Sequence, residues 1–528
     1  MTRRHVPRPA RSAFAAPGLA LLLALAPAAW AGEKAPDVAR AEEPGEETGE
    51  EAGEETERKH GDGGHDDPGE DDPGEDDRGE DGHGEDHGAY SSRLSDVAKP
   101  LDIGGMPERP KPLLEVGEPF LGTGTLKPGF TLPTGATWQP QGLLFGTWRT
   151  ALQSFEPDSE DGRITELSTR LDLFFNLALS GSERLVVGVR ALDGNGRFTS
   201  YFFEHPDPDL DGEFRDELDL DLEHLFFEGD FGEIFPNLDK EDFGITDFGF
   251  SVGRQDLLFQ EGLLINDVID GVGITRNTLL PGNTSNVRYT FFYGWNNIDT
   301  SFGNERDADL FALLTSVDVP WSTIDADLAY LSTDDLSGDM VAGGVSFVQR
   351  LGSTNSSFRV LASQAVDEET AFSTDGVLLF SELSWVPHGT HDLLYVNSFW
   401  AIDRYSPVAR GVGGPGAGPL GRAGVNFAAA DIGSFNAPLS AQAWDVAGGA
   451  VGYQAFFDHG RSQLLGEIGF RVGTEDTVAD AYAATLRYQF AYGRRAVFVI
   501  DAFGGYRERL GGGGDNPYGG RVELVLKF

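Results

Sequence analysis

From about residue 141 to the end of the chain, apolar and polar side chains alternate in runs of about ten residues separated by turn residues. Leu171, Leu173 and Phe175 share one face of such a run, whereas Arg170 and Asp172 lie on the other. The same period of two returns in the segments 287–295, 464–472, 482–492 and 522–528. Alternation of this kind predicts β-strands with one apolar and one polar face.

A soluble β-sandwich shows the same alternation, and three features favour a membrane barrel instead. Aromatic residues occur near strand ends, as in the girdles at the two membrane interfaces: Trp148, Trp295, Trp385, Trp400, Tyr488 and Tyr492. Short connections, such as 319–322 and 493–494, interleave with longer ones, such as 296–306 and 403–446. The chain also ends on an alternating strand whose last residue is Phe528. This ending resembles the terminal strand that outer-membrane proteins present to their assembly machinery.

The predicted fold class is all-β, a transmembrane antiparallel barrel over residues 141–528. We count about 18 strands, within a range of roughly 16 to 18. Closure satisfies every backbone polar group inside the lipid, which an open sheet does not achieve. A barrel of this width is expected to enclose an aqueous lumen in place of a packed core.

The first 140 residues divide into three predicted segments. Residues 1–31 have a basic front, the apolar run GLALLLALA and an Ala-Trp-Ala cleavage site, which is typical of a signal peptide. Residues 32–96 are an acidic, His-containing linker without a core, predicted to be disordered and periplasmic. Residues 97–140 are a Pro/Gly-rich periplasmic approach to the barrel.

The composition excludes several classes of protein. The chain has no Cys, which rules out disulfides, thiolate zinc sites and a Cys nucleophile. Its formal net charge of −46 argues against nucleic acid as a partner. Residues 42–86 hold 22 acidic and 3 basic residues and so contribute −19, while residues 87–528 still carry −31. The part predicted to fold is therefore acidic in its own right.

Charged residues on the polar faces of the predicted strands are candidates for lining the lumen. They are Arg149, Arg170, Asp172, Arg288, Glu467, Arg471, Arg487, Asp501, Arg521, Glu523 and Lys527. In one interpretation they form a charged ladder that selects solutes by sign and size. In the other they are water-facing residues that pair with one another.

Two sets of residues suggest metal binding. Asp207, Asp209 and Asp211, followed by Gly212, repeat the first half of an EF-hand loop and predict a weak calcium site in an outer loop. Leu218 stands where that loop needs a bidentate Glu, and an ordinary acidic loop is the alternative. The linker histidines could bind zinc or nickel, or simply belong to a solvated spacer: His60, His65, His83 and His87. No other cofactor is expected.

A short motif resembles that of a known family. Gly253-Arg254-Gln255 at a strand end, followed by a loop and Ile269 to Val272 (IDGV), resembles the alginate-export-like barrels. The resemblance implies an 18-stranded channel that passes a polysaccharide. The acidic excess of the barrel departs from the basic lumen that a polyanion exporter needs. Strand parity assigns Arg254 and Asp270 to the lipid face, as an ion pair, unless a β-bulge turns either of them inward.

The predicted function is a passive outer-membrane channel for small hydrophilic solutes, including sugars or oligosaccharides. The first alternative is a polysaccharide export pore, and the second is a plugged surface-binding or metal-gathering barrel. The Gly/Pro/Ala-rich connection 404–448 either constricts the pore or forms a surface flap. Neither a nucleophile elbow in its strand–turn–helix context nor a P-loop occurs, so no enzyme is expected. An acidic lumen predicts cation preference, and a dominant Arg ladder predicts the opposite.

Overall fold

The structure, a computed structural model, describes residues within the second of the two units into which the chain divides, residues 91–528. The described ranges are 111–117, 129–157, 162–194, 197–240, 244–299, 305–306, 308–333, 338–366, 368–370, 373–411 and 418–528. The predicted signal peptide, the linker and most of the approach segment lie outside these residues.

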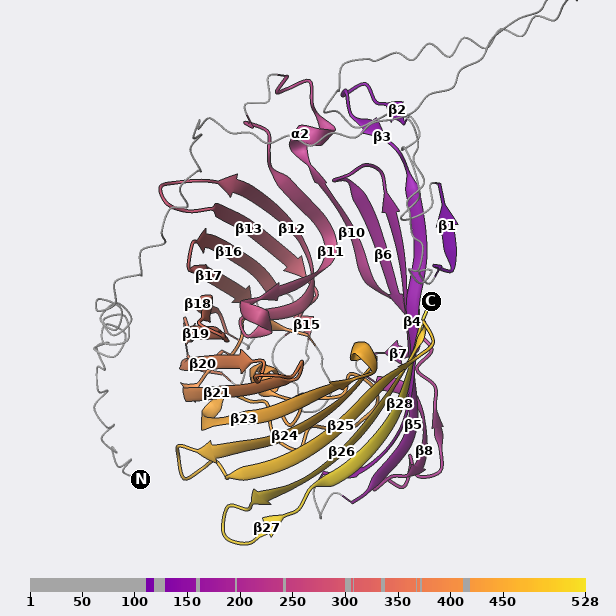
Figure 1. Cartoon of the computed structure of the whole chain (residues 1–528), viewed down its shortest axis with the longest axis vertical. Coiled ribbons are helices and arrows are strands. Elements are labelled where there is room, and N and C mark those ends of the chain that lie inside the picture. Colours follow the sequence, from indigo (N-terminus) through magenta and orange to yellow (C-terminus); the bar gives the residue numbers. More distant parts are fainter. Residues whose placement is uncertain are drawn as a thin grey trace, which may run out of the picture. The chain divides into compact units, whose positions relative to one another are not determined.

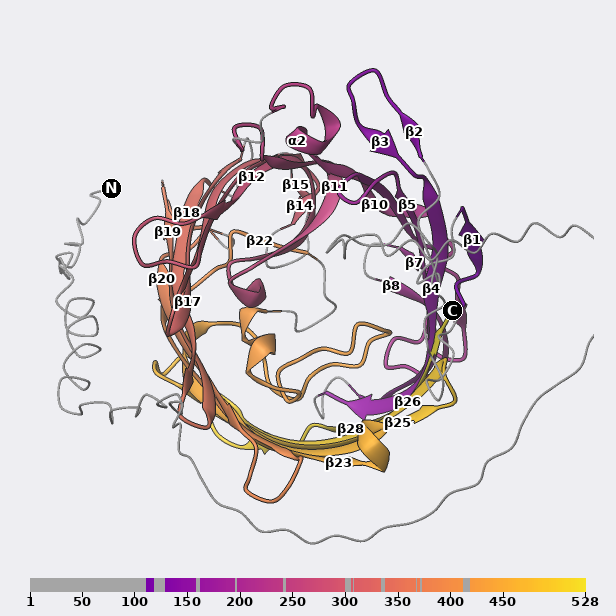
Figure 2. The same cartoon turned by 45° about the horizontal axis from the view of Figure 1, so that its top comes forward.

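Eighteen antiparallel strands close into a barrel, which confirms the predicted fold class (Figures 1 and 2). The wall strands are β4 (Gln141–Glu156), β5 (Ile164–Ala178), β6 (Arg184–Arg190), β10 (Asp221–Asp230), β11 (Gly249–Phe259), β12 (Ile265–Leu279), β13 (Asn286–Asn296), β16 (Ala308–Val319), β17 (Ser322–Thr333), β18 (Met340–Leu351), β19 (Thr354–Ala365), β20 (Gly376–Trp385), β21 (Leu393–Arg404), β23 (Trp444–Phe457), β24 (Ser462–Gly473), β25 (Ala481–Tyr492), β26 (Ala496–Glu508) and β28 (Tyr518–Lys527). The ring closes where β28 pairs with β4, with Leu526 opposite Trp148.

Shorter elements decorate the wall. The strands are β1 (Leu114–Val116), β2 (Phe130–Thr131), β3 (Thr137–Trp138), β7 (Asp193–Gly194), β8 (Arg197–Glu204), β9 (Phe214–Arg215), β14 (Ile298–Asp299), β15 (Glu305–Arg306), β22 (Ala409–Arg410) and β27 (Gly514–Asp515). The helices are α2 (Phe231–Ile234) and the 3-10 turns η1 (Gln260–Gly262), η2 (Pro419–Ala423) and η3 (Asp458–Gly460). Within the described ranges, no helix has the length and apolarity needed to cross a membrane.

The connections differ between the two rims of the barrel. The short-turn rim is the one at which β4 begins and β28 ends, and tight turns such as 320–321 and 493–495 close it. The long-loop rim carries the longer connections, including residues 405–443 between β21 and β23. The largest departure from this rule is the connection 231–248 at the short-turn rim, which joins β10 to β11 and contains α2. The predicted alternation of loop lengths is therefore present, with this exception.

Side chains alternate between the two faces of the wall as predicted, but the inner face is not polar throughout. On β16, Phe311 and Leu313 are exposed on the outside, whereas Leu310, Ala312 and Leu314 are buried on the inside. Together with buried residues of β17 to β21 they belong to one apolar cluster. The expectation of an aqueous lumen without a packed core was wrong for this sector, because chain segments fold into the barrel and cover it.

Candidate functional site: the interior of the barrel

Among the described residues, two long segments enter the barrel (Figure 2). The first, called the inner hairpin, is the end of β11 and the start of β12 with η1 between them, residues 255–269. Pairing of β11 with β10 ends at Arg254, and regular pairing of β12 with β13 ends at Gly271, so the hairpin leaves the wall there. Gly253 marks this point with a φ of 120°, and a Cβ there would lie 2.1 Å from the Leu225 carbonyl oxygen. Only glycine suits that position.

The second, called the inner segment, comprises the described residues 405–411 and 418–443 between β21 and β23 (Figure 2). Its first part docks on the inner hairpin. The Tyr405 hydroxyl donates to the Leu263 carbonyl oxygen at 2.8 Å, and β22 pairs in parallel with the start of β12 through Ala409 and Ile265. The Arg410 guanidinium donates to the Gly262 carbonyl oxygen at 2.7 Å. Of the two predictions for the connection 404–448, the inward fold is therefore the one observed.

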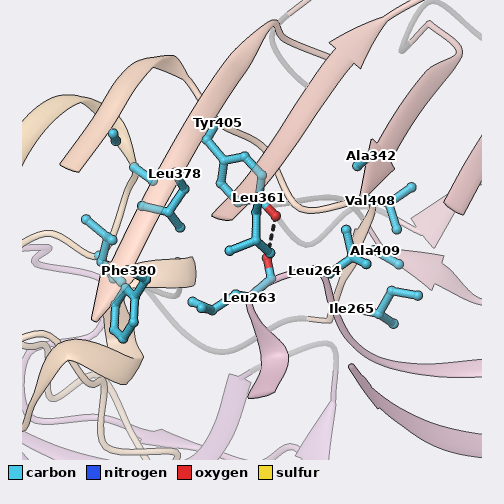
Figure 3. Packing of buried hydrophobic residues seen from close by; sticks show 14 of the residues in the cluster. Leu263, Leu264, Ile265, Ala342, Leu361, Leu378, Phe380, Tyr405, Val408 and Ala409 are labelled. Atoms are coloured by element: carbon cyan, nitrogen blue, oxygen red, sulfur yellow. Dashed lines mark hydrogen bonds between the residues drawn. The ribbon is translucent and has the colours of Figure 1, made fainter. Parts of the chain in front are cut away.

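Burial accompanies this docking. The apolar side chains Leu263, Leu264 and Ile265 belong to one buried cluster with Leu361 and Leu378 of the wall, and Figure 3 shows Ile265 beside Ala409. Burying one such aliphatic side chain stabilises the fold by about 1.5–3 kcal/mol relative to leaving it exposed to water. The same burial raises the pKa of the Tyr405 phenol and lowers the pKa of Arg410 to about 10.

A buried carboxylate holds the middle of the inner segment. Glu467 of β24 accepts hydrogen bonds from the backbone N–H groups of Val425 (3.0 Å) and Asn426 (2.8 Å). It also accepts from the Asn426 side chain and from the Tyr395 hydroxyl. Glu467 is only 2% exposed. The inner-face assignment of Glu467 was right, but its placement as an open lumen residue was wrong because the inner segment covers it.

Other wall residues hold the rest of the segment. Glu166 accepts hydrogen bonds from the Ser434 N–H (2.5 Å) and from Gln153 (2.7 Å), and Gln153 also donates to the Ile432 carbonyl. Arg471, a predicted lumen residue, donates to the Gln442 carbonyl at 3.2 Å and is likewise an anchor. Sequence reasoning missed Gln153 and Glu166, although strand parity places both on the same face as Arg149 and Arg170.

Five of the predicted residues form one continuous row of charges across four strands. Arg487 pairs with Asp501 (2.7 Å), Asp501 with Arg521 (2.6 Å), Arg521 with Glu523 (3.3 Å) and Glu523 with Arg149 (2.6 Å). The central Arg521 side chain is 4% exposed, whereas Arg487 and Arg149 at the ends are 26% and 20% exposed. The charges therefore pair with one another while the end guanidiniums still meet solvent, and selection of solutes by this row stays a prediction.

A second row continues along the next strands. Asp172 pairs with Arg170 at 2.9 Å and with Arg190 at 3.2 Å, and Arg190 also contacts Asp193 and Glu223. Arg170 in addition donates to the Asp431 carbonyl of the inner segment at 3.0 Å. Arg170 and Asp172 are among the predicted lumen residues, whereas Arg190 and its acidic partners were not predicted.

A cavity of about 200 Å³ lies between the tip of the inner hairpin and the wall from β13 to β19. Arg288 lines it and is exposed, and in the part of the chain that the structure describes it has no ion-pair partner. Asp325 and Asp327 line the same cavity and accept hydrogen bonds from Ser346 (3.0 Å) and Gln260 (2.7 Å). Arg288 is among the predicted lumen residues. The two aspartates, which occupy alternate positions of β17, were not predicted.

The remaining predicted residues lie away from the interior network. Lys527 is exposed at the short-turn rim. Arg254 and Asp270 form an ion pair at 2.9 Å on the outer face, which they share with the exposed side chains of Val252 and Ile274. The predicted ion pair is confirmed, and the motif arginine does not point into the lumen.

The carboxylates of Asp207, Asp209 and Asp211, the predicted calcium ligands, do not converge on a common site. Asp207 accepts a hydrogen bond from the Asp209 N–H, and Asp211 accepts one from the His205 N–H. Across the described ranges, no group of three His, Asp or Glu side chains is arranged to hold a metal ion. Calcium binding stays a prediction, and His60, His65, His83 and His87 lie outside the described residues.

Comparison with solved structures places the fold. A BenF-like porin from Pseudomonas fluorescens Pf-5 superposes with a TM-score of 0.51 at 10% identity, over 73% of this chain and 99% of that one. The chain is similar in fold to outer-membrane porins. The porin OccK2 (OpdF) of Pseudomonas aeruginosa gives a TM-score of 0.49 at 10% identity, over 73% and 98% of the two chains. No family model and no curated protein matches the sequence. The resemblance to alginate-export barrels stays a hypothesis.

Proposed function

We propose that this porin-like barrel is an outer-membrane channel through which small hydrophilic solutes diffuse passively, including sugars or oligosaccharides. The main observation behind this proposal is the charged inner face of the barrel. On this face Arg149, Arg487 and Arg288 remain accessible to solvent. The similarity in fold to outer-membrane porins also supports a channel function. We further propose that the N-terminal segment lies in the periplasm and that the outer-membrane assembly machinery is the folding partner, and no enzymatic role is proposed.

The two alternative functions, a polysaccharide export pore and a plugged barrel, differ in how much of the barrel interior must be open. A polysaccharide export pore requires room for a polymer, and the inner segment and inner hairpin take up part of that room. A plugged barrel is favoured by the same packing. Conductance separates a plugged barrel from a channel.

The purified chain is expected to produce steady step conductances in a planar lipid bilayer. Water-filled passages past the accessible arginines would carry the current. A barrel that inserts without conducting would contradict the proposal and favour the plugged alternative.

Charges in the cavity at the hairpin tip are expected to set ion preference. Arg288→Gln should shift the reversal potential in a salt gradient toward cation preference, and Asp325→Asn should shift it toward anions. A unit charge about 4 Å from a passing ion is worth about 1 kcal/mol in water, which corresponds to about a five-fold change in permeability ratio. Arg163→Gln is the control, because Arg163 bonds to Tyr518 at the long-loop rim. Equal reversal potentials in all variants would show that the conducted ions do not pass through this cavity.

A further inference from the structure

The connection between β10 and β11 presents apolar side chains at the short-turn rim. We call its described residues, 231–240 and 244–248, the rim loop. Five apolar side chains in it are exposed: Phe231, Phe235, Leu238, Ile245 and Phe248. Leu238 and Ile245 are 74% and 71% exposed, and none of the four residues of α2 is buried. A group of exposed apolar side chains on one loop of a folded chain marks a candidate interaction surface.

Polar contacts hold the rim loop in place, which leaves its apolar side chains free to point outward. The Asp230 carboxylate caps α2 by accepting the Gly232 N–H at 2.8 Å. Arg276 of β12 donates to the carbonyl oxygens of Asp247 (2.6 Å) and Gly244 (2.5 Å), and its guanidinium lies 4.8 Å from the centre of the Phe248 ring. The patch is therefore a fixed feature of the rim.

The patch continues the outer apolar face of the barrel. The Phe231 ring lies 4.7 Å from the Phe250 ring, and Phe250 shares its face of β11 with the exposed Val252. Six other connections at this rim also carry exposed apolar side chains at or beside their turns: Leu280, Trp321, Leu351, Val386, Phe457 and Tyr492. The rim loop thus joins a belt of apolar residues around the short-turn rim, and Figure 2 shows α2 at the edge of the ring of strands.

We infer that the rim loop is seated in the lipid bilayer interface and anchors the barrel at its short-turn rim. Aromatic and aliphatic side chains next to polar groups favour the boundary between headgroups and acyl chains. The partner is the phospholipid leaflet, since the patch is continuous with the face that lipid would cover. This inference rests on the proposed membrane location of the barrel.

The absence of Cys from the sequence provides a direct test, because each introduced Cys is unique. Leu238→Cys and Ile245→Cys would carry nitroxide labels in barrels refolded into phosphatidylcholine vesicles. Spin relaxation by oxygen, which partitions into lipid, would be compared with relaxation by a water-soluble nickel chelate. Leu313→Cys on the outer face of β16 is the lipid control, and Asp476→Cys in the exposed turn between β24 and β25, at the long-loop rim, is the water control. The rim-loop labels are expected to be oxygen-favoured, as at position 313.

The outcomes separate the anchor from the membrane location. Nickel-favoured labels at positions 238 and 245, with an oxygen-favoured label at 313, would overturn the anchor and leave the membrane location standing. A nickel-favoured label at 313 as well would overturn both. Dipolar broadening between labels, with low access to both reagents, would show a second copy of the chain on the patch and overturn the lipid assignment. Arg276→Gln is expected to increase label mobility at position 245 while the label at 313 is unchanged.

Discussion

Replacing residues 407–441 by a short Gly-Ser link is expected to raise the single-channel conductance several-fold. The inner segment fills part of the interior and docks on the inner hairpin through Tyr405 and β22, so its removal widens the conducting cross-section. The reversal potential should also change, because the Arg170 contact with Asp431 is lost and Arg170 becomes more accessible. Planar-bilayer recordings of the two proteins at the same salt concentration would measure both effects.

The control shortens another connection at the long-loop rim. Residues 509–513 join β26 to β27 and lie outside the inner segment, so their shortening should leave the conductance near its original value. Heat-dependent migration in detergent gels would show that both shortened barrels are folded. An unchanged conductance in a folded barrel without the inner segment would mean that the current bypasses that segment or is limited elsewhere.

Glu467→Ala is expected to destabilise the barrel by about 3 kcal/mol or more, which is the loss of several charge-assisted hydrogen bonds in a buried position. The backbone N–H groups of Val425 and Asn426 and the Tyr395 hydroxyl would lose their acceptor. The inner segment should then detach from β24 and the channel current should become noisy. Urea titration of the barrel in lipid vesicles would give the change in the free energy of unfolding.

Two matched variants sharpen this test. Glu467→Gln keeps one acceptor oxygen and should lose less stability than Glu467→Ala. Ile468→Ala removes an exposed apolar side chain at the next position of the same strand and should change the current little. Equal effects of Glu467→Ala and Ile468→Ala on channel noise would argue against the carboxylate as the anchor of the inner segment.

The period-two pattern predicted the strands, their faces and the two rims because lipid outside and register inside force side chains to alternate. It predicted the inner-face positions of Arg149 and Glu467 equally well, yet only Arg149 meets solvent. Parity assigns a face, and it carries no information about which other segment covers that face. Glu467 is covered by chain some 40 residues earlier in the sequence, a tertiary contact without a local signal.

The inner segment could not be placed from its sequence, because Gly-, Pro- and Ala-rich chain has neither a strand nor a helix period. Its partner surface did carry a signal. Residues 310–314 read Leu-Phe-Ala-Leu-Leu, a continuous apolar run that is typical of a strand buried on both faces. The buried inner face of β16 is the physical counterpart of that run.

Before the barrel closes, a strand that is apolar on both faces has no water-compatible side to present. Residues 310–314 of β16 form such a stretch in the unfolded chain, and stretches of this type associate with one another readily. In the folded barrel lipid covers the outer side of β16, and the inner hairpin and inner segment pack in the same apolar cluster as its inner side. We therefore expect the unfolded chain to be prone to aggregation, and slow closure of the barrel to increase that tendency.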